Sequence, residues 1–199
     1  VNVNGTVNML QIAAEQGRMY GEPVKVVFPS SIAVYGFGSL AQKIKAGAVS
    51  EYVHCKPSTM YGCNKLYCEH LGRYYAHSYR QLAQDSVQGE DKNRGVVDFR
   101  CVRYPGLISA ETVPTGGTSD FVPEMLHAAA RGEAYKCFVR EDSRIPFMTM
   151  PEAIDATLQL AAAPRNELTQ IVYNIASFSP SAGEVAELVK QYFPAADIT

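Results

Sequence analysis

The sequence lacks the features of several protein classes. Among its 199 residues, no apolar run approaches the ~18 residues that a membrane-spanning helix needs. No block of five like charges occurs, and 18 Lys and Arg residues against 20 Asp and Glu residues give a net charge of −2. This balance argues against nucleic-acid binding and against a polybasic membrane-surface protein. Internal repeats are also absent, and 47% hydrophobic residues indicate a globular chain of about one domain.

Cysteine usage favours free thiols. The five cysteines are an odd number, none of them forms a C-x-x-C pair, and no secretory signal leads the chain. We therefore expect reduced thiols and a cytoplasmic protein. His70 and His77 lie seven residues apart without a Cys or carboxylate partner at ligand spacing, so we expect no metal site.

Helical and strand-like segments alternate along the chain. The first 17 residues have helical spacing and begin without an initiator Met, so we expect upstream sequence to be missing. Strands are expected at residues 24–28, 96–104, 134–139, 147–150 and 170–175, and an exposed loop at 84–95. Helices are expected at 40–45, 60–82, 119–131, 151–163 and 180–193, the last with Ser179 as its N-cap. This alternation indicates an α/β fold with a mostly parallel sheet.

Tyr61 and Lys65 are candidate catalytic residues. Four residues apart on a helix, their side chains share one face, about 6 Å apart along the axis. A tyrosine with a pKa near ~10 is a poor base, and a nearby ammonium lowers that pKa because it favours the phenolate. The spacing alone is weak evidence, since surface helices often carry Tyr and Lys.

The preceding strand supplies a context for this pair. Ser30 and Ser31 end that strand, at the sheet edge where α/β folds form ligand crevices. The order Ser30-Ser31, Ala33-Val34-Tyr35-Gly36 and Tyr61-x-x-x-Lys65 resembles the extended short-chain dehydrogenases, the family of NAD-dependent epimerases and dehydratases. Asn2-Val3-Asn4-Gly5-Thr6 and Arg103-Tyr104-Pro105-Gly106 match this family as well.

The resemblance covers essentially the whole chain and implies a fold and a domain division. The implied fold is a Rossmann-like, doubly wound α/β fold with a mostly parallel sheet and a small α/β substrate-binding lobe. Residues 1–110 would be the C-terminal part of the NAD-binding domain, with the catalytic Ser, Tyr and Lys. Residues 111–199 would be mainly the substrate-binding lobe, with one strand returning to the sheet.

The resemblance also implies NAD as cofactor and a role for each site residue. Tyr61 would be the base, Lys65 would lower its pKa and hold the nicotinamide ribose, and Ser31 would bind the reacting hydroxyl. Ser31 is preferred over Ser30 because it matches the family position four before Tyr35. The implied cofactor contacts are Tyr61, Lys65, Tyr104, Gly106, Leu107 and Ile108, and the implied substrate contacts are Ser31, Tyr61, Thr118 and Ser119. Thr118, Ser119 and Asp120 would equally suit a helix N-cap.

Three stretches favour one branch of this family, the amino-acid dehydrogenases that oxidise the β-hydroxyl of L-threonine to a ketone. They are residues 99–109, 116–121 and 140–148. The sugar-nucleotide branch usually has Arg-Tyr-Phe-Asn where this chain has Arg103-Tyr104-Pro105-Gly106. A sugar-nucleotide epimerase or dehydratase stays the alternative, with Arg140 and Arg144 as a candidate diphosphate clamp. A non-catalytic binding or assembly fragment is a third possible function.

The sequence departs from the family at two places. It has no strand followed by a glycine fingerprint for the pyrophosphate. The pattern Gly36-x-Gly38-x-x-Ala41 imitates the fingerprint, but it lies in the expected active-site loop. We therefore expect the glycine-rich N-terminal part to be missing. The loop from about residue 80 to 95 is longer than usual, and we expect it to leave the chain a monomer or a weakened homodimer.

Overall fold

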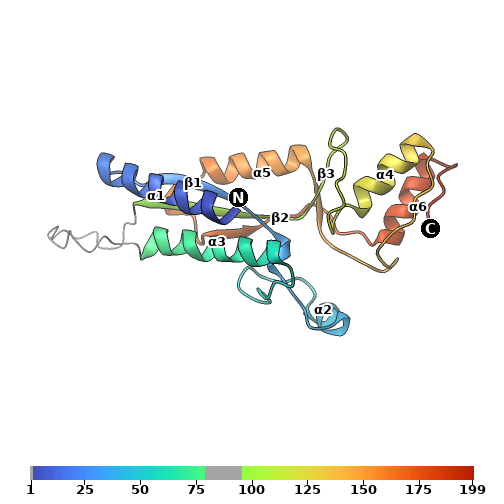
Figure 1. Ribbon diagram of the computed structural model, residues 1–199, viewed down its shortest axis with the longest axis horizontal. Coiled ribbons are helices and arrows are strands. Elements are labelled where there is room, and N and C mark those ends of the chain that lie inside the picture. Colours follow the sequence, from blue (N-terminus) through green and yellow to red (C-terminus); the bar gives the residue numbers. More distant parts are fainter. Residues whose placement is uncertain (1, 79–95) are drawn as a thin grey trace. The chain divides into compact units, whose positions relative to one another are not determined.

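Three strands form the sheet of the first part of the molecule, in the order β1–β2–β5 (Figure 1). They are β1 (Val24–Ser31), β2 (Val97–Tyr104) and β5 (Val172–Asn174). β2 pairs in parallel with β5, with Cys101 opposite Val172. Residues 97–103 of β2 are all buried, as in a strand covered on both faces of an α/β sheet. This computed structural model describes residues 2–78 and 96–199.

Alternate residues of β2 contact helices on opposite faces of the sheet. Phe99 packs against Gly72 of α3 (Met60–His77), and it shares a core with Leu10 of α1 (Asn2–Tyr20). Arg100 reaches the other face, where its guanidinium donates to the carbonyl of Leu160 near the end of α5 (Met150–Ala162). Figure 1 shows α3 and α5 on either side of the strands.

The chain divides into two compact units. The first comprises Val1–Arg103 and Thr157–Asn174, and the second comprises Tyr104–Ala156 and Ile175–Thr199. The first unit also contains a 3-10 turn η1 (Ile32–Val34), the short helix α2 (Leu40–Ala46) and the turn η2 (Arg165–Glu167). No helix in the described parts of the chain is long and apolar enough to cross a bilayer. All five cysteines are described, and each is a free thiol.

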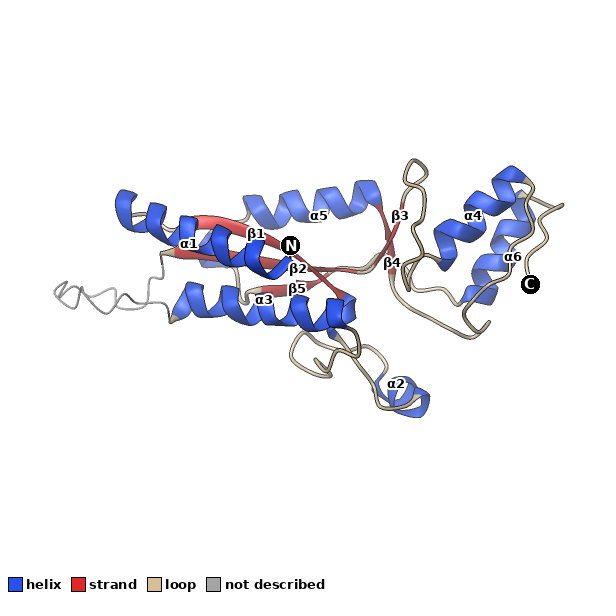
Figure 2. Ribbon diagram, in the orientation of Figure 1, coloured by secondary structure: helices blue, strands red, loops and turns tan. Residues whose placement is uncertain are grey.

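The second unit has its own core and a small sheet. β3 (Gly106–Ile108) pairs in parallel with β4 (Phe147–Thr149), and Gly106 lies so close to the Phe147 ring that an added Cβ would stand 2.5 Å from it. Phe147 and Phe121 pack edge to face with ring centroids 5.5 Å apart. α4 (Phe121–Arg131) and α6 (Ala182–Tyr192) pack against each other beside this cluster (Figure 2).

The mixed α/β class with parallel pairing is confirmed, but two details of the sequence analysis are wrong. The strand expected at 134–139 does not form, and its β pairing is limited to an isolated bridge between Tyr135 and Ile198. The N-cap of α6 is Ser181 and not Ser179. The Ser181 side chain accepts from the Glu184 amide and the Glu184 side chain accepts from the Ser181 amide, which makes a complete capping box.

Some expectations fall partly or wholly outside the described residues. The tyrosine helix was expected to continue to residue 82, and α3 is described to His77. The loop expected at 84–95 lies outside the described residues.

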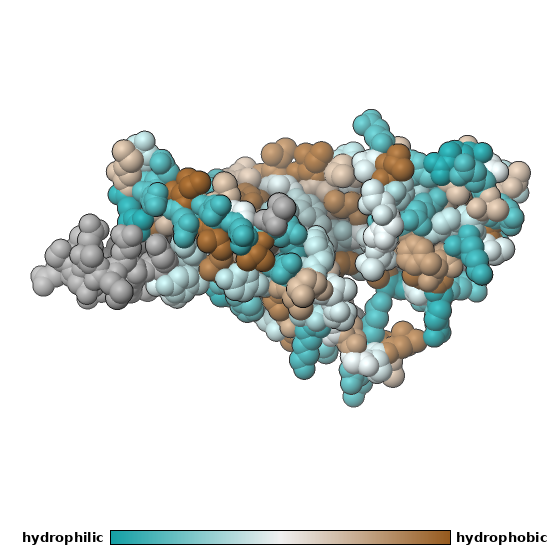
Figure 3. All heavy atoms as spheres, viewed as in Figure 1, coloured by the Kyte–Doolittle hydropathy of each residue, from teal (hydrophilic) through white to brown (hydrophobic). Residues whose placement is uncertain are grey.

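One face of α1 leaves large apolar side chains exposed. Met9 and Ile12 are more than half exposed, as are Met19 and Tyr20 at the end of the helix. Figure 3 shows brown and tan spheres among teal ones over α1. α1 packs against α3 in the same unit through other residues, among them the buried Leu10 and Ala14.

Candidate active site

The two serines at the end of β1 face different surroundings. Ser30 is buried, and its hydroxyl donates to Glu69 Oε1 on α3 over 2.5 Å. Ser31 is partly exposed, and its Oγ accepts from the Ala33 amide over 3.1 Å, which caps the turn η1. The Ser30 hydroxyl is therefore used inside the protein, whereas Ser31 remains accessible.

Tyr61 and Lys65 lie one above the other in the first turns of α3. The Lys65 Nζ atom is 5.4 Å from the centre of the Tyr61 ring and 5.0 Å from that of Phe28. Lys65 is 7% exposed, whereas Tyr61 is 48% exposed. The Lys65 ammonium donates to the Pro29 carbonyl over 2.5 Å, two residues before Ser31. Lys65 thus lies between the end of β1 and the accessible phenol.

A glycine lets α3 approach the serine turn. A Cβ added at Gly62 would stand 2.0 Å from the Ala33 carbonyl oxygen, closer than any side chain tolerates. Thr59, whose side chain accepts from the Gly62 amide over 3.0 Å, begins the helix at this contact. The structure therefore brings the turns that carry Ser31 and Tyr61 against each other, with Lys65 next to both.

Burial and nearby thiols act on the pKa of Lys65 in opposite directions, and burial dominates. Removal from water lowers the pKa of the Lys65 ammonium, and the nearby thiols of Cys68 and Cys101 only partly oppose this. Hydrogen bonding to the Pro29 carbonyl fixes one of its three N–H donors. The chemistry of this donor set suits a hydroxyl-bearing ligand next to Tyr61.

The remaining predicted contacts lie in the second unit. Gly106, Leu107 and Ile108 form β3, and Gly106 donates its amide to the Pro146 carbonyl over 3.0 Å. Thr118 and Ser119 precede α4, whose N-cap is Asp120. The Asp120 carboxylate makes no capping bond and instead accepts from the amides of Thr115 and Gly117. The roles of Tyr104, of β3 and of this turn stay predictions.

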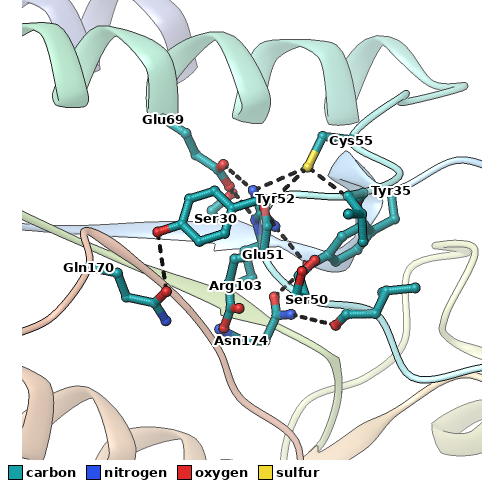
Figure 4. Close-up of polar contacts among 12 residues, drawn as sticks. Ser30, Tyr35, Ser50, Glu51, Tyr52, Cys55, Glu69, Arg103, Gln170 and Asn174 are labelled. Atoms are coloured by element: carbon teal, nitrogen blue, oxygen red, sulfur yellow. Dashed lines mark hydrogen bonds and ion pairs between the residues drawn. The ribbon is translucent and has the colours of Figure 1, made fainter.

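Sequence reasoning missed one member of the site region, Glu69. Glu69 lies four residues after Lys65 and eight after Tyr61, so the helical spacing that places Tyr61 and Lys65 on one face also places Glu69 there. Its carboxylate is buried against Arg103, at 2.8 Å from Nε and 2.6 Å from Nη2 (Figure 4). No group of three or more His, Cys, Asp or Glu residues that could hold a metal occurs within residues 2–78 and 96–199.

Comparison with known proteins defines the class. The chain belongs to the NAD dependent epimerase/dehydratase family, which matches residues 1–176. It is 31% identical over all 199 residues to the mitochondrial L-threonine 3-dehydrogenase of Bos taurus and spans 46% of that protein. It is 33% identical over 195 residues to an uncharacterized epimerase/dehydratase of Staphylococcus aureus, of which it spans 52%.

Solved structures agree with this class. The apo form of a GalE-like L-threonine dehydrogenase from Cupriavidus necator matches with a TM-score of 0.80 and 36% identity, over 99% of this chain and 62% of that one. The expected Rossmann-like fold class is thereby confirmed. The chain spans about half the length of the curated relatives it matches.

Proposed function

We propose that this chain provides the catalytic residues for the NAD-dependent oxidation of L-threonine to 2-amino-3-ketobutyrate, as an L-threonine 3-dehydrogenase. The observation that carries the proposal is the cluster of Tyr61, Lys65 and Ser31, in which a buried ammonium lies under an accessible phenol beside a serine turn. The similarity to L-threonine 3-dehydrogenases at 31% to 36% identity supports L-threonine as the substrate. We also propose a cytoplasmic location.

In the proposed reaction, Tyr61 is the general base for the 3-hydroxyl of the substrate. The phenolate takes the hydroxyl proton, and the C–O bond becomes a carbonyl as the carbinol carbon loses a hydride. The positive charge of Lys65, 5.4 Å from the centre of the Tyr61 ring, offsets the negative charge that takes part in this proton transfer. Ser31 donates a hydrogen bond to the reacting oxygen and orients it.

NAD is the implied cofactor, and when bound it would supply the hydride acceptor. Lys65 and Tyr61 fit its nicotinamide ribose, because a buried ammonium with free donors and an adjacent phenol suit a pair of sugar hydroxyls. Gly36 does not serve the pyrophosphate. An added Cβ at Gly36 would stand 1.8 Å from the Lys56 carbonyl oxygen, so close packing of the loop explains this glycine.

A sugar-nucleotide epimerase or dehydratase is the second candidate, because the family of this chain includes epimerases and dehydratases. It would use the same Ser31, Tyr61 and Lys65 but would also need cations for a diphosphate. The two arginines considered for that role are engaged elsewhere in the second unit. Arg140 pairs with Asp142 at 2.7 Å, and Arg144 pairs with Glu184 at 2.8 Å. Both pairs are exposed at the surface, where ion pairs are weak, so they do not by themselves decide between the two candidates.

Replacement of the base tests the proposal. Tyr61→Phe removes one oxygen and little volume, so kcat for NADH formation from L-threonine should fall roughly 10²-fold, the scale of a lost general base. The assay follows NADH absorbance with the chain joined to a glycine-rich nucleotide-binding segment of a relative. Tyr67→Phe is the matched control, because Tyr67 is on the same helix and equally exposed, at 50%. Near-normal rates for Tyr61→Phe across pH 6 to 10 would contradict the assignment, and turnover of a UDP-sugar without L-threonine oxidation would favour the second candidate.

A further inference from the structure

The Arg103 guanidinium on β2 uses all five of its N–H donors inside the protein. It is 2% exposed. Nε and one Nη2 hydrogen contact the two oxygens of Glu69, at 2.8 and 2.6 Å. Nη1 donates to Tyr35 Oη at 2.7 Å and to the Glu51 carbonyl at 2.9 Å, and Nη2 also contacts Cys55 Sγ at 3.6 Å. Figure 4 shows these side chains converging on Arg103.

The partners of Arg103 come from two segments next to the proposed site. Glu69 is on α3, one turn beyond Lys65. Tyr35, Glu51 and Cys55 lie in the connection that leaves the serine turn η1 and leads to the start of α3. One buried cation therefore holds the catalytic helix and the segment that joins Ser31 to Tyr61.

β5 holds the same connection from a second direction. Tyr35 Oη donates to Asn174 Oδ1 at 2.8 Å, and the backbone amide of Asn174 donates to Glu51 Oε1 at 2.9 Å. The charge of Arg103 is consistent with this geometry. Burial alone would lower the pKa of Arg103, but the hydrogen bonds and charge of Glu69 raise it above its ordinary value, so the guanidinium stays charged.

Glu69 extends this network to the end of β1. Its Oε1 accepts from the Ser30 hydroxyl at 2.5 Å, while Lys65 donates to the Pro29 carbonyl at 2.5 Å. Two polar contacts from one face of α3 thus hold the two residues that precede Ser31. A shift of Glu69 would move the β1 end relative to Lys65.

We propose that Arg103 and Glu69 are positioning residues that fix Lys65, Ser31 and the connection 35–55 for catalysis. This inference rests on the proposed function for its catalytic consequence. A purely stabilising role fits the geometry less well, because a buried ion pair contributes little net stability relative to apolar packing. The five directed donors instead require the planar guanidinium, which lysine cannot replace.

Arg103→Lys tests the proposal, because it keeps the positive charge and loses the fork of donors. Arg100→Lys is the matched control. Arg100 is on the same strand, 1% exposed and paired with Asp98 at 2.7 Å, but it faces α5 instead of α3. Glu69→Gln is a second variant, which keeps an acceptor for Ser30 and removes the charge.

Two measurements on the chain itself test the proposal without an activity assay. The alkylation rate of Cys55, resolved by peptide mass spectrometry, should rise about tenfold or more in Arg103→Lys, because opening of the connection exposes the thiol. The ¹⁵N NMR resonance of the Lys65 ammonium should shift in Arg103→Lys and Glu69→Gln. Neither should change in Arg100→Lys.

Kinetics supply the third measurement, in the complete enzyme assay. Mispositioning should lower kcat roughly 10- to 100-fold in Arg103→Lys, while KM for L-threonine changes less than about twofold. Arg100→Lys should keep the wild-type kcat. An unchanged Cys55 rate, an unchanged kcat or equal effects of Arg100→Lys would overturn the proposal. If the wild type does not oxidise L-threonine, the proposed function fails. An unshifted Lys65 resonance would then overturn the positioning role, and a shifted one would retain it.

Discussion

Lys65 meets two opposing requirements. Its proposed role requires the ammonium to lie close to the Tyr61 ring, yet the position that achieves this is almost fully buried. Burial lowers the pKa of Lys65, which means that the folded protein binds this proton less tightly than the unfolded chain does. The residue proposed to assist catalysis therefore lowers stability in its charged form.

The pH dependence of stability should reveal this cost. Because the pKa of Lys65 is lower in the folded state, the contribution of Lys65 to the wild-type free energy of unfolding should rise with pH between that lowered value and the unfolded value near ~10.4. Lys65→Met lacks this titration, so it should equal or exceed the wild type in stability near neutral pH. Its advantage should shrink as the pH increases. Urea unfolding followed by circular dichroism from pH 6 to 10 is the measurement, and parallel curves for the two proteins would refute the expectation.

Elements in the first unit are set against each other by glycines at close approaches. Gly62 places the start of α3 against η1, and Gly72 places its middle against the Phe99 ring, 2.1 Å from where a Cβ would stand. Phe99 is buried, so the ring has little room to move. The spacing between α3 and β2 depends on the missing side chain at position 72.

Two alanine substitutions should have opposite effects. Gly72→Ala should destabilise the protein by about 1–3 kcal/mol through overpacking against Phe99. Gly5→Ala on α1 has nothing within 4 Å of the added Cβ and should stabilise by roughly 0.5–1 kcal/mol, because alanine favours the helix. Chemical denaturation of both variants measures the difference. A neutral Gly72→Ala would show that α3 shifts freely on the sheet.

At the scale of the whole molecule, the chain carries two cores and about half the length of its curated relatives. One core surrounds Phe99 and Leu10 in the first unit, and the other surrounds Phe121 and Phe147 in the second. The division of function between residues 1–110 and 111–199 stays a prediction. So does the weakened homodimer, for which the exposed apolar face of α1 is a candidate surface that light scattering can examine.

A polypeptide of these 199 residues should bind NAD weakly. In the proposed site, Tyr61 and Lys65 hold only the nicotinamide ribose, and the sequence has no glycine fingerprint followed by a helix N-terminus for the pyrophosphate. Calorimetry should therefore give a Kd above the micromolar range. Joining a glycine-rich segment of a relative should tighten binding at least about tenfold, given the anion affinity of helix N-termini. Micromolar affinity of the unmodified polypeptide would show that another part of the chain binds the pyrophosphate.

The local sequence determined the helices and strands that have a hydrophobic pattern within their own residues. The periodicity of α3 and the β-branched run of β1 predicted their type and starting region, because each reflects burial against neighbouring elements. The helical spacing of Tyr61 and Lys65 likewise placed both on one face, as the 5.4 Å separation between ammonium and ring shows.

Tertiary structure decided what depends on partners distant in the chain. β3 was not expected, since its three residues form a strand only by pairing with β4 some 40 positions later. The strand expected at 134–139 does not form, and its β pairing is limited to the isolated bridge between Tyr135 and Ile198. The sequence places Arg103 on a strand, in a stretch that matches the family, but shows no partner for its side chain. Only folding, which buries it against Glu69 and the connection 35–55, gives it five partnered donors, because a buried guanidinium must find an acceptor for each.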